Sequence, residues 1–267
     1  MTHWATVFAI FGLCFSNSKC LYVDMTYDWF AGLPQYPGHN PFKLKLVHKG
    51  PFLGSPFYIL NDIEMPEHTG THIDAPYHFN ESGWRVNEIP LDHLVGPAVV
   101  LDIREKMSKV PSGKEPNADV VDAETWESKY GRIPNGAIVI MNSGNGKNWP
   151  NVTAYSGAKD PNNSSILRFP GFSLELAEWL VKNRTIIGIA TDALSFEPHP
   201  VITGIPVHNL FASHNVWGVE NLANIDQIPE NGANVYVMPL RIRGGSGSPA
   251  RVFAKWNKRK LEKSRKD

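Results

Sequence analysis

The strongest constraint on the fold is a set of short apolar segments, most of them bounded by Gly, Pro or Asn. They are Phe42–His48, Ala98–Ile103, Ala137–Asn142, Thr185–Thr191 and Val235–Leu240. Segments of this length that are rich in β-branched residues favour strands. Because several are apolar almost throughout, we expect strands that are covered on both faces rather than the half-exposed strands of a sandwich.

Helical patterns lie between these segments in the second half of the chain. The clearest helix is Ser173–Lys182, which Ser173 can cap and which Asn183 can close. A second helix is expected over 123–130, with Asp122 as its cap. The loose alternation of strands and helices predicts an α/β or mixed α+β fold in which helices flank a mixed sheet.

Length and composition indicate a single folded domain. The chain has 267 residues, of which 42% are hydrophobic, and its formal net charge is zero. A neutral chain has no broad positive field, so nucleic acid is a poor partner for it. No repeat or low-complexity linker interrupts residues 21–256, which we expect to form one domain. Residues 257–267 are expected to be a solvated basic tail.

The first 20 residues have the features of a signal peptide. An apolar run from Trp4 to Phe15 is too short to span a membrane, and small residues follow it. A cleavage site is expected after Ser18 or Cys20. The protein is therefore expected to be secreted, with no membrane association once the signal is removed. The alternatives for this segment are a buried N-terminal strand or helix and a retained membrane anchor.

The cysteines and glycosylation sequons agree with that expectation. Cys14 and Cys20 both lie in or next to the signal segment, so no internal disulfide is expected in the mature chain. Five sequons predict a glycoprotein. A glycan on Asn80 would crowd the histidine-rich stretch over 67–79, so this sequon is expected to be unused. The sequons start at Asn80, Asn151, Asn162, Asn163 and Asn183.

Candidate metal ligands gather between residues 67 and 79, in the stretch EHTGTHIDAPYHF. His68, His72 and Asp74 offer imidazole and carboxylate donors, a combination that suits Zn²⁺ or Mn²⁺. The stretch contains no thiolate of the kind that closes a structural zinc site. We therefore expect a coordination position open to water.

The local sequence argues against a helix here. Gly70 separates the first two histidines, Pro76 follows closely, and the HExxH pattern of zinc proteases is absent. We expect a turn that enters an extended piece, in which His72 and Asp74 project to one side and the residue between them points into the core. His78 is interpreted as an acid/base that handles the proton of metal-bound water, with a structural histidine as the alternative.

Further ligands are expected far downstream. Glu220 lies in a largely apolar run, where a charge should be paired or bound to metal. His208 and His214 compete as the imidazole donor, and the pattern alone does not choose between them. Four other residues are interpreted as solvated or capping groups, namely Asp62, Asp92, Asp192 and His199.

Aromatic residues near the motif are candidates for the walls of a substrate pocket. Trp29 and Phe30 precede it, as does Tyr36, and Trp84 follows it. The glycine-rich block over 244–251 is interpreted as a tight turn with packing contacts, and a pocket-lining loop is the alternative. It lacks the spacing of a phosphate-binding loop.

With these residues in view, the chain resembles the metal-dependent cyclase and hydrolase family that includes bacterial kynurenine formamidase and isatin hydrolase. The family signature HxGTHxDxPxH is present without substitution between His68 and His78. Segments such as FPGFSLELAEWL and GIATDALSFEP are similar too, so the resemblance covers about residues 21–256.

The resemblance implies that His68, His72 and Asp74 hold the catalytic metal and that His78 is the acid/base. It also implies that Glu220 is a later ligand. A histidine twelve residues before that glutamate serves a second metal in formamidase-like members, which favours His208 over His214, so one or two ions are expected. The implied fold is a single-domain β/β/α arrangement of the swivelling cyclase type around a β-barrel-like centre, assembled as dimers or tetramers.

The function implied is hydrolysis of a small aryl formamide or cyclic amide by metal-activated water. No GxSxG sequence is present, which argues against the serine-hydrolase type of formamidase. Two alternatives stay open at the level of sequence. One is a secreted, non-catalytic protein that binds metal or ligand on the same fold, and the other is an enzyme that performs a dehydration or cyclisation.

Overall fold

The computed structural model describes residues 20–111, 117–201 and 204–257. Nearly all of the expected signal peptide and of the expected basic tail lie outside these residues; Cys20, the last residue of the expected signal, begins β1. The strands are β1 (Cys20–Asp24), β2 (Lys43–Phe52), β3 (Ser55–Glu64), β4 (His72–Asp74), β5 (Val95–Asp102), β6 (Ala137–Asn142), β7 (Ile186–Thr191), β8 (Trp217–Glu220), β9 (Asn234–Pro239) and β10 (Gly247–Asn257). The α-helices are α1 (Arg104–Ser108), α2 (Val120–Tyr130), α3 (Val152–Ser156), α4 (Leu174–Asn183) and α5 (Pro206–Ser213).

Seven strands close into a mixed barrel. They hydrogen bond in the order β10, β4, β8, β7, β6, β5 and β9, and β9 pairs back to β10. The pairs from β5 to β8 are parallel, whereas β4 and β10 run antiparallel to their neighbours. The β-barrel-like centre implied by the resemblance is therefore confirmed.

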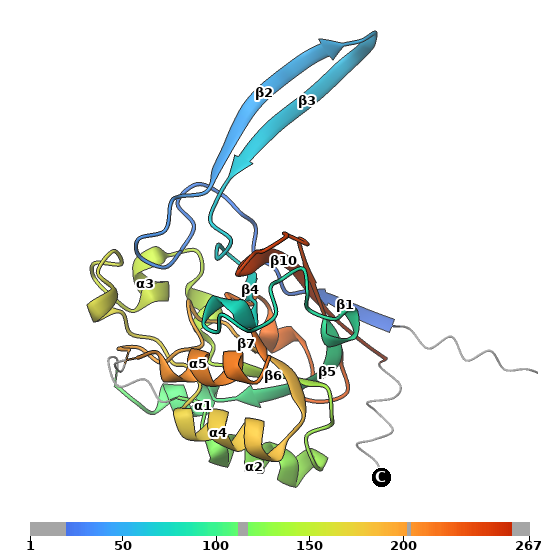
Figure 1. The fold of residues 1–267 in the computed structure, drawn as a ribbon. Helices are drawn as coiled ribbons and strands as arrows, with labels where there is room; N and C mark the ends of the chain where they lie inside the picture. Colours follow the sequence, from blue (N-terminus) through green and yellow to red (C-terminus); the bar gives the residue numbers. More distant parts are fainter. Residues whose placement is uncertain (1–19, 112–116, 202–203, 258–267) are drawn as a thin grey trace, which may run out of the picture.

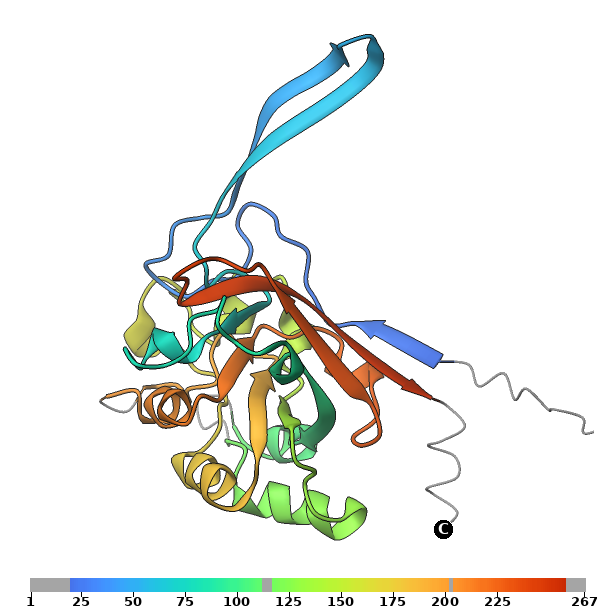
Figure 2. The same ribbon diagram turned by 45° about the vertical axis from the view of Figure 1, so that its right-hand side comes forward.

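The central strands are buried on both faces, as their apolar sequences predict. Consecutive residues of a strand point to opposite sides, so Val99 and Val100 of β5 enter different cores. One core fills the barrel and includes Ile140 and Trp217. The other lies outside it, where α2 and α4 cover the sheet and Leu176 packs against the strands (Figure 2).

The expected helices form, although one begins earlier than predicted. Helix α4 begins with Ser173 as its cap, whose side chain accepts a hydrogen bond from the backbone of Leu176. In α2 the cap is Asp119, and Asp122, the expected cap, instead completes a capping box as the third helical residue. Aspartate is a favourable N-cap residue at either position, so the sequence alone did not show whether the helix begins after Asp119 or after Asp122.

The glycine-rich block forms a turn followed by the long strand β10. Gly244 has a φ of +79° in the turn, and Gly247–Pro249 pair with β4. The interpretation as a turn with packing contacts is confirmed, but the strand itself was not predicted, nor was α5. Among the residues described, no helix is long and apolar enough to cross a bilayer.

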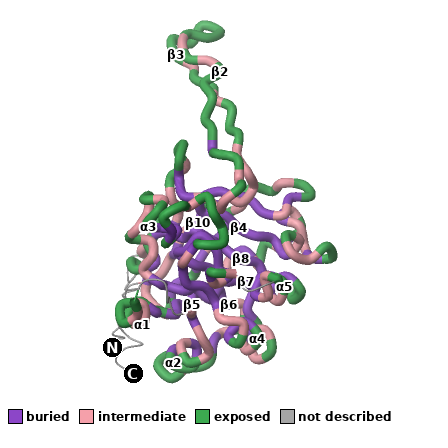
Figure 3. The backbone as a smooth tube through the Cα atoms, turned by 90° about the vertical axis from the view of Figure 1, so that its left-hand side faces the viewer, coloured by how far each residue is buried: buried purple, intermediate pink, exposed green. Residues whose placement is uncertain are grey.

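Strands β2 and β3 form a long hairpin, the arm, which comprises residues 43–64. The arm projects away from the barrel and is the most prominent extension of the molecule (Figure 1). Most of its residues are exposed, in contrast to the buried barrel strands (Figure 3).

Candidate metal centre

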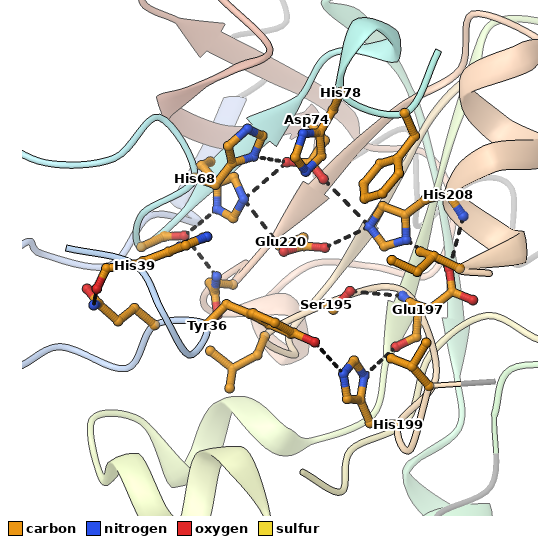
Figure 4. Close-up of a pocket in the computed structure, with 18 residues that line it drawn as sticks. Tyr36, His39, His68, Asp74, His78, Ser195, Glu197, His199, His208 and Glu220 are labelled. Carbon is orange, nitrogen blue, oxygen red and sulfur yellow. Dashed lines mark hydrogen bonds and ion pairs between the residues drawn. The ribbon is translucent and has the colours of Figure 1, made fainter. Parts of the chain in front are cut away.

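Three elements bring the candidate ligands together at one end of the barrel. Strand β4 carries His72 and Asp74, with Ile73 between them fully buried in the core, as the extended interpretation predicts. Strand β8 pairs antiparallel with β4, and Glu220 lies directly opposite His72. Facing side chains of such a pair are neighbours, so two segments about 150 residues apart in the sequence share one site. His208 reaches it from α5 (Figure 4).

The inner atoms of these side chains surround a small common space. His72 Nε2 lies 3.2 Å from Asp74 Oδ1 and 3.5 Å from Glu220 Oε2. His208 Nε2 lies 3.7 Å from Asp74 Oδ2 and 3.5 Å from Glu220 Oε1. Two donors bound tetrahedrally about 2.1 Å from one ion lie about 3.4 Å apart, so these spacings suit ligands of a common cation.

The outer nitrogens of the two buried imidazoles are held by acceptors. His72 Nδ1 is 2.8 Å from the carbonyl oxygen of Gly70, and His208 Nδ1 is 2.8 Å from Glu197 Oε2. Each outer nitrogen must therefore carry a hydrogen and donate it. In the neutral rings the lone pair then lies on Nε2 and faces the carboxylates. Nε2 of His72 is buried and has no hydrogen-bond partner.

A third imidazole is oriented by a longer chain of hydrogen bonds. Glu67 Oε2 accepts the hydroxyl hydrogen of Ser246 at 2.7 Å, so Ser246 Oγ can only accept from His68 Nε2, 2.9 Å away. The other ring nitrogen, Nδ1, faces Asp74 Oδ1 at 2.6 Å. In neutral His68 the hydrogen therefore lies on Nε2, and the lone pair on Nδ1 faces the carboxylate of Asp74.

Two overlapping sets of donors can hold a metal. One is His72, Asp74 and Glu220, and the other is His68, Asp74 and His78, each with ligand atoms within 4.8 Å of one another. Asp74 belongs to both sets, as a carboxylate between two ions would. The residues present therefore fit one or two divalent cations. His68 and His72 both face Oδ1 of Asp74, so the set of His68, His72 and Asp74 that the resemblance implies also lies together.

Buried carboxylates dominate the electrostatics of the site. Burial opposes the charged form of His72, but the nearby carboxylates of Asp74 and Glu220 outweigh it and raise the pKa of His72 to about 9. Burial likewise opposes the charged form of His208, whereas Glu197 and Glu220 raise its pKa to about 9. Burial would raise the pKa of Asp74, but the neighbouring histidines hold it well below its ordinary value.

These pKa values predict that metal binding becomes stronger as the pH rises. Below about pH 9, His72 and His208 of the metal-free protein carry protons that a cation must displace. Raising the pH from 6.5 to 8.5 should strengthen Mn²⁺ or Zn²⁺ binding by at least about tenfold per unit. Calorimetry in two buffers of different ionisation enthalpy measures the affinity and the protons released. An affinity independent of pH would contradict the prediction.

His78 lies at the edge of the site and differs from the other histidines. Its ring stacks on that of His68, with centroids 3.9 Å apart, while the residue as a whole is exposed. Its imidazole ring is nevertheless enclosed by neighbouring side chains, and this burial of the ring lowers its pKa to about 4; Asp74 opposes this shift and the neighbouring imidazoles add to it. At neutral pH its imidazole is uncharged and can accept a proton.

The donors line a cavity of about 210 Å³. Of the four aromatic residues expected near the pocket, Tyr36 lines this cavity, whereas Trp29, Phe30 and Trp84 are not among its lining residues. Trp84 is partly buried and packs against the barrel core. The apolar wall is instead supplied by other residues, chiefly Phe79, Leu194, Val201 and Ile205.

Sequence reasoning missed residues that support the ligands. Glu197 is a lone charge in the apolar run ALSFEP, a signal of the same kind that singled out Glu220. Asp192 and His199 were expected to be solvated or capping residues, but both are buried. Asp192 accepts hydrogen bonds from the loop after β6, and His199 Nε2 is 3.0 Å from the hydroxyl of Tyr36. The exposure expected of Asp62 and Asp92 is confirmed. His214 is exposed, and its ring bonds its own helix instead.

Gly70 also supports the site, because its carbonyl oxygen accepts the hydrogen bond of His72 Nδ1. We expect the Gly70→Ala substitution to destabilise the protein by about 2–5 kcal/mol. Its φ is +59°, and an added Cβ would lie 2.4 Å from the indole nitrogen of Trp29. Gly54→Ala is a matched control, because its φ is +85° but nothing lies within 4 Å of the added Cβ. That control should cost only about 1–2 kcal/mol. Equal losses in urea unfolding would contradict the packing argument.

Comparison with known proteins agrees with this fold and site. The family model described as "Putative cyclase" matches residues 23–198. Isatin hydrolase from Roseibium aggregatum is 31% identical over 211 residues, covering 74% of this chain and 75% of its own. Kynurenine formamidase from Salinibacter ruber is 26% identical over 193 residues, covering 72% and 78%.

Solved structures give the same result. Isatin hydrolase A from Ralstonia solanacearum superposes with a TM-score of 0.80 at 28% identity, covering 89% of this chain and 92% of that one. The closed barrel and its cluster of imidazoles and carboxylates define a cyclase-type hydrolase with a candidate metal centre. The chain belongs to the putative cyclase family.

Proposed function

We propose that the protein is a metal-dependent amidohydrolase that cleaves a C–N bond in a small aryl formamide or cyclic amide, with Zn²⁺ or Mn²⁺ as its cofactor. One observation carries the proposal. The imidazoles of His72 and His208 are each held from outside by an acceptor, so that their inner nitrogens converge on Asp74 and Glu220. Such an arrangement presents lone pairs and negative charge to a cation.

Each ligand has a defined part in this proposal. His72, Asp74 and Glu220 would hold one ion, with His208 beside them, and His68 would add a further donor next to Asp74. A bound divalent cation lowers the pKa of water toward neutrality and polarises an amide carbonyl. His78 then takes the proton from the attacking water and returns it to the leaving nitrogen. The ring is uncharged at neutral pH, so its nitrogen lone pair is free, and its low pKa makes it a weak base that readily gives the proton back.

The cavity supports a small substrate. Its volume of about 210 Å³ is below the range of roughly 300–1,000 Å³ typical of ligand pockets. Phe79 and Leu194 offer apolar contacts, while the hydroxyl of Tyr36 is fixed by His199. Both named relatives are amide hydrolases by their names, isatin hydrolase and kynurenine formamidase. This similarity supports a planar aromatic amide as the substrate class.

The test is metal analysis followed by assays. Purified protein should contain one or two equivalents of a transition metal, lose activity with a chelator and regain it with Mn²⁺ or Zn²⁺. Hydrolysis of isatin, N-formylkynurenine or a simple aryl amide is followed by absorbance. Full activity of metal-free protein would refute the mechanism, and absence of all three activities in metal-loaded protein would refute the substrate class.

We further propose that the protein enters the secretory pathway. The apolar N-terminal segment supports this, as do sequons at exposed positions such as Asn151 and Asn162. At Asn80 the side-chain amide donates to the carbonyl of Ala212 at 3.2 Å, which agrees with an unused sequon. Expression of the full chain in a eukaryotic host, with glycosidase treatment of the medium, tests this. Unglycosylated protein retained inside the cell would refute it.

A further inference from the structure

A second cavity lies at the carboxyl ends of the parallel strands β6 and β7, which are adjacent in the sheet (Figure 1). Asn142 ends β6 and Asp192 directly follows β7, and both residues line the cavity. Ligands of parallel sheets bind preferentially outside the carboxyl ends of the strands. The cavity has a volume of about 330 Å³, which is large enough for a small organic molecule.

This cavity is distinct from the one at the metal centre, and the two share no lining residue. Ile140 of β6 belongs to the barrel core, so Asn142, two residues further along the strand, projects to the same side. Ile73 of β4 also belongs to that core, so its neighbours His72 and Asp74 project to the opposite side. The second cavity and the metal ligands therefore belong to opposite faces of the barrel sheet.

Asp192 supplies a buried negative charge at the second cavity. The residue is 3% exposed, and its carboxylate accepts hydrogen bonds from three neutral groups, which are the backbone and hydroxyl of Ser143 and the backbone of Gly146. Within the described chain, no lysine, arginine or histidine forms an ion pair with it. Burial raises the pKa of Asp192, while these hydrogen bonds oppose the shift. A cationic group in the cavity would stabilise the charged carboxylate.

Asn142 presents unused hydrogen-bonding groups to the same cavity. The residue is 3% exposed, yet its carboxamide forms no hydrogen bond to another residue that the structure describes. Buried amides normally have partners, so water or a ligand in the cavity must supply them here. A carboxamide can both donate and accept, which suits a ligand that carries groups of both kinds.

The rim of the cavity carries a cation that is free to bind an anionic group. Lys147 is exposed and forms no ion pair with any residue in the described ranges. Arg104 also lines the cavity, but two of its guanidinium nitrogens already bond the carboxylate of Asp102. Asp226 is exposed at the rim as well. The lining therefore offers charges of both signs instead of the positive excess that a simple anion would need.

We propose that this cavity binds a zwitterion, namely an α-amino acid with an apolar side chain, whose ammonium group pairs with Asp192 and whose carboxylate faces Lys147. The carboxamide of Asn142 completes the hydrogen bonding of the polar end. Leu222 and Ile225 are buried in the wall of the cavity and offer apolar contacts to the ligand's side chain.

Simpler ligands would satisfy only part of this cavity. An inorganic anion would meet the buried carboxylate of Asp192, and an amine without a carboxylate would leave Lys147 unpaired. A metal ion is disfavoured too, because neither candidate metal-binding group of the described chain includes Asp192.

The first test is calorimetric titration of the full chain with amino acids and with two analogues that each lack one charge. L-phenylalanine or L-leucine should bind with a millimolar or lower dissociation constant. N-acetyl-L-phenylalanine lacks the ammonium group and 2-phenylethylamine lacks the carboxylate, so each should bind at least about tenfold more weakly than L-phenylalanine. The proposal fails if neither amino acid shows saturable binding up to about 20 mM, or if the analogues bind as tightly.

The Asn142→Leu variant distinguishes an asparagine that serves a ligand from one that serves the fold. Leucine has a similar shape and lacks the carboxamide, which has no partner in the described chain, so the melting temperature should be unchanged or higher. The dissociation constant of L-phenylalanine should rise at least about tenfold. A lower melting temperature with unchanged affinity would assign Asn142 to the fold and overturn the proposal.

The Lys147→Gln variant tests the carboxylate contact at an exposed residue, where folding should not be affected. It should weaken L-phenylalanine binding by about three- to tenfold and leave 2-phenylethylamine binding unchanged. Lys159→Gln is the matched control, because Lys159 is also exposed but does not line the cavity. It should bind as wild type does. Equal affinities of the two variants for L-phenylalanine would contradict the proposed orientation.

Amino acids also chelate metal ions, so the same titration is made with the Asp74→Asn variant, which should lose its metal. Its affinity for L-phenylalanine should equal that of wild type, because Asp74 lines the other cavity. Loss of binding in this variant would place the amino acid at the metal centre and reject the second site. None of these tests measures hydrolysis, so this proposal and the hydrolase proposal can fail separately.

Discussion

The Asp74→Asn variant should lose metal binding and turnover together. Asp74 Oδ1 faces both His68 and His72, and its second oxygen faces His208. Asparagine keeps the shape but removes the charge and replaces one oxygen with a nitrogen that donates hydrogen bonds. We expect metal content below about a tenth of wild type and a fall in kcat/KM of more than about 10³. Plasma emission analysis and a turnover assay measure the two effects.

Asp62→Asn makes the same chemical change on the exposed arm and is the control. It should keep its metal and its activity. Turnover that persists in an Asp74→Asn protein shown to be free of metal would disprove the assignment of the centre.

Substitution of His78 should have a different result, because His78 is proposed to move protons. His78→Gln should keep the ion bound by His72, Asp74 and Glu220, while kcat falls by about 10²–10⁴, the range for a positioned acid/base. The loss should appear mainly in kcat. Metal stoichiometry and steady-state kinetics at saturating metal separate the two effects.

The geometry also allows a competing outcome for this variant. His78 lies in a possible ligand set with His68 and Asp74. Loss of one equivalent of metal, with activity recovered at high metal concentration, would show that His78 is a ligand and reject its role as the acid/base. His214→Gln is the control, since His214 is exposed and bonds its own helix. It should leave both metal and kcat unchanged.

The local sequence was most informative where one interaction dominates. Segments such as Ala137–Asn142 became buried strands with the bounds expected, because a continuous apolar run of that length has few other stable solutions. Ser173 begins its helix for an equally local reason, because its side chain accepts a hydrogen bond from the backbone of Leu176 three residues later. At Asp122 two nearby aspartates could each cap the helix, and propensity did not decide between them.

The arm shows the limit of that reasoning. The segment over 42–48 was expected as a strand because it is apolar and extended, and it does form most of β2. Its leucines alternate with lysines, as in a strand that buries one face. Only the structure shows that Leu44 and Leu46 are exposed, with no other described element packed on them. Exposure depends on what packs against a strand and not on the strand's own sequence.

The sequence by itself determined the candidate donors, because the density of histidine and aspartate between residues 68 and 78 has no other chemistry as specific. It also determined that Glu220, a charge in an apolar run, needed a partner. Only the tertiary structure decided that the candidate donors gather around Asp74, that Glu197 rather than solvent orients His208, and that Trp29 packs against Gly70 and does not line the cavity. The contacts around Asp74 join segments up to about 150 residues apart, and such pairings follow from strand register and barrel closure, which no local pattern encodes.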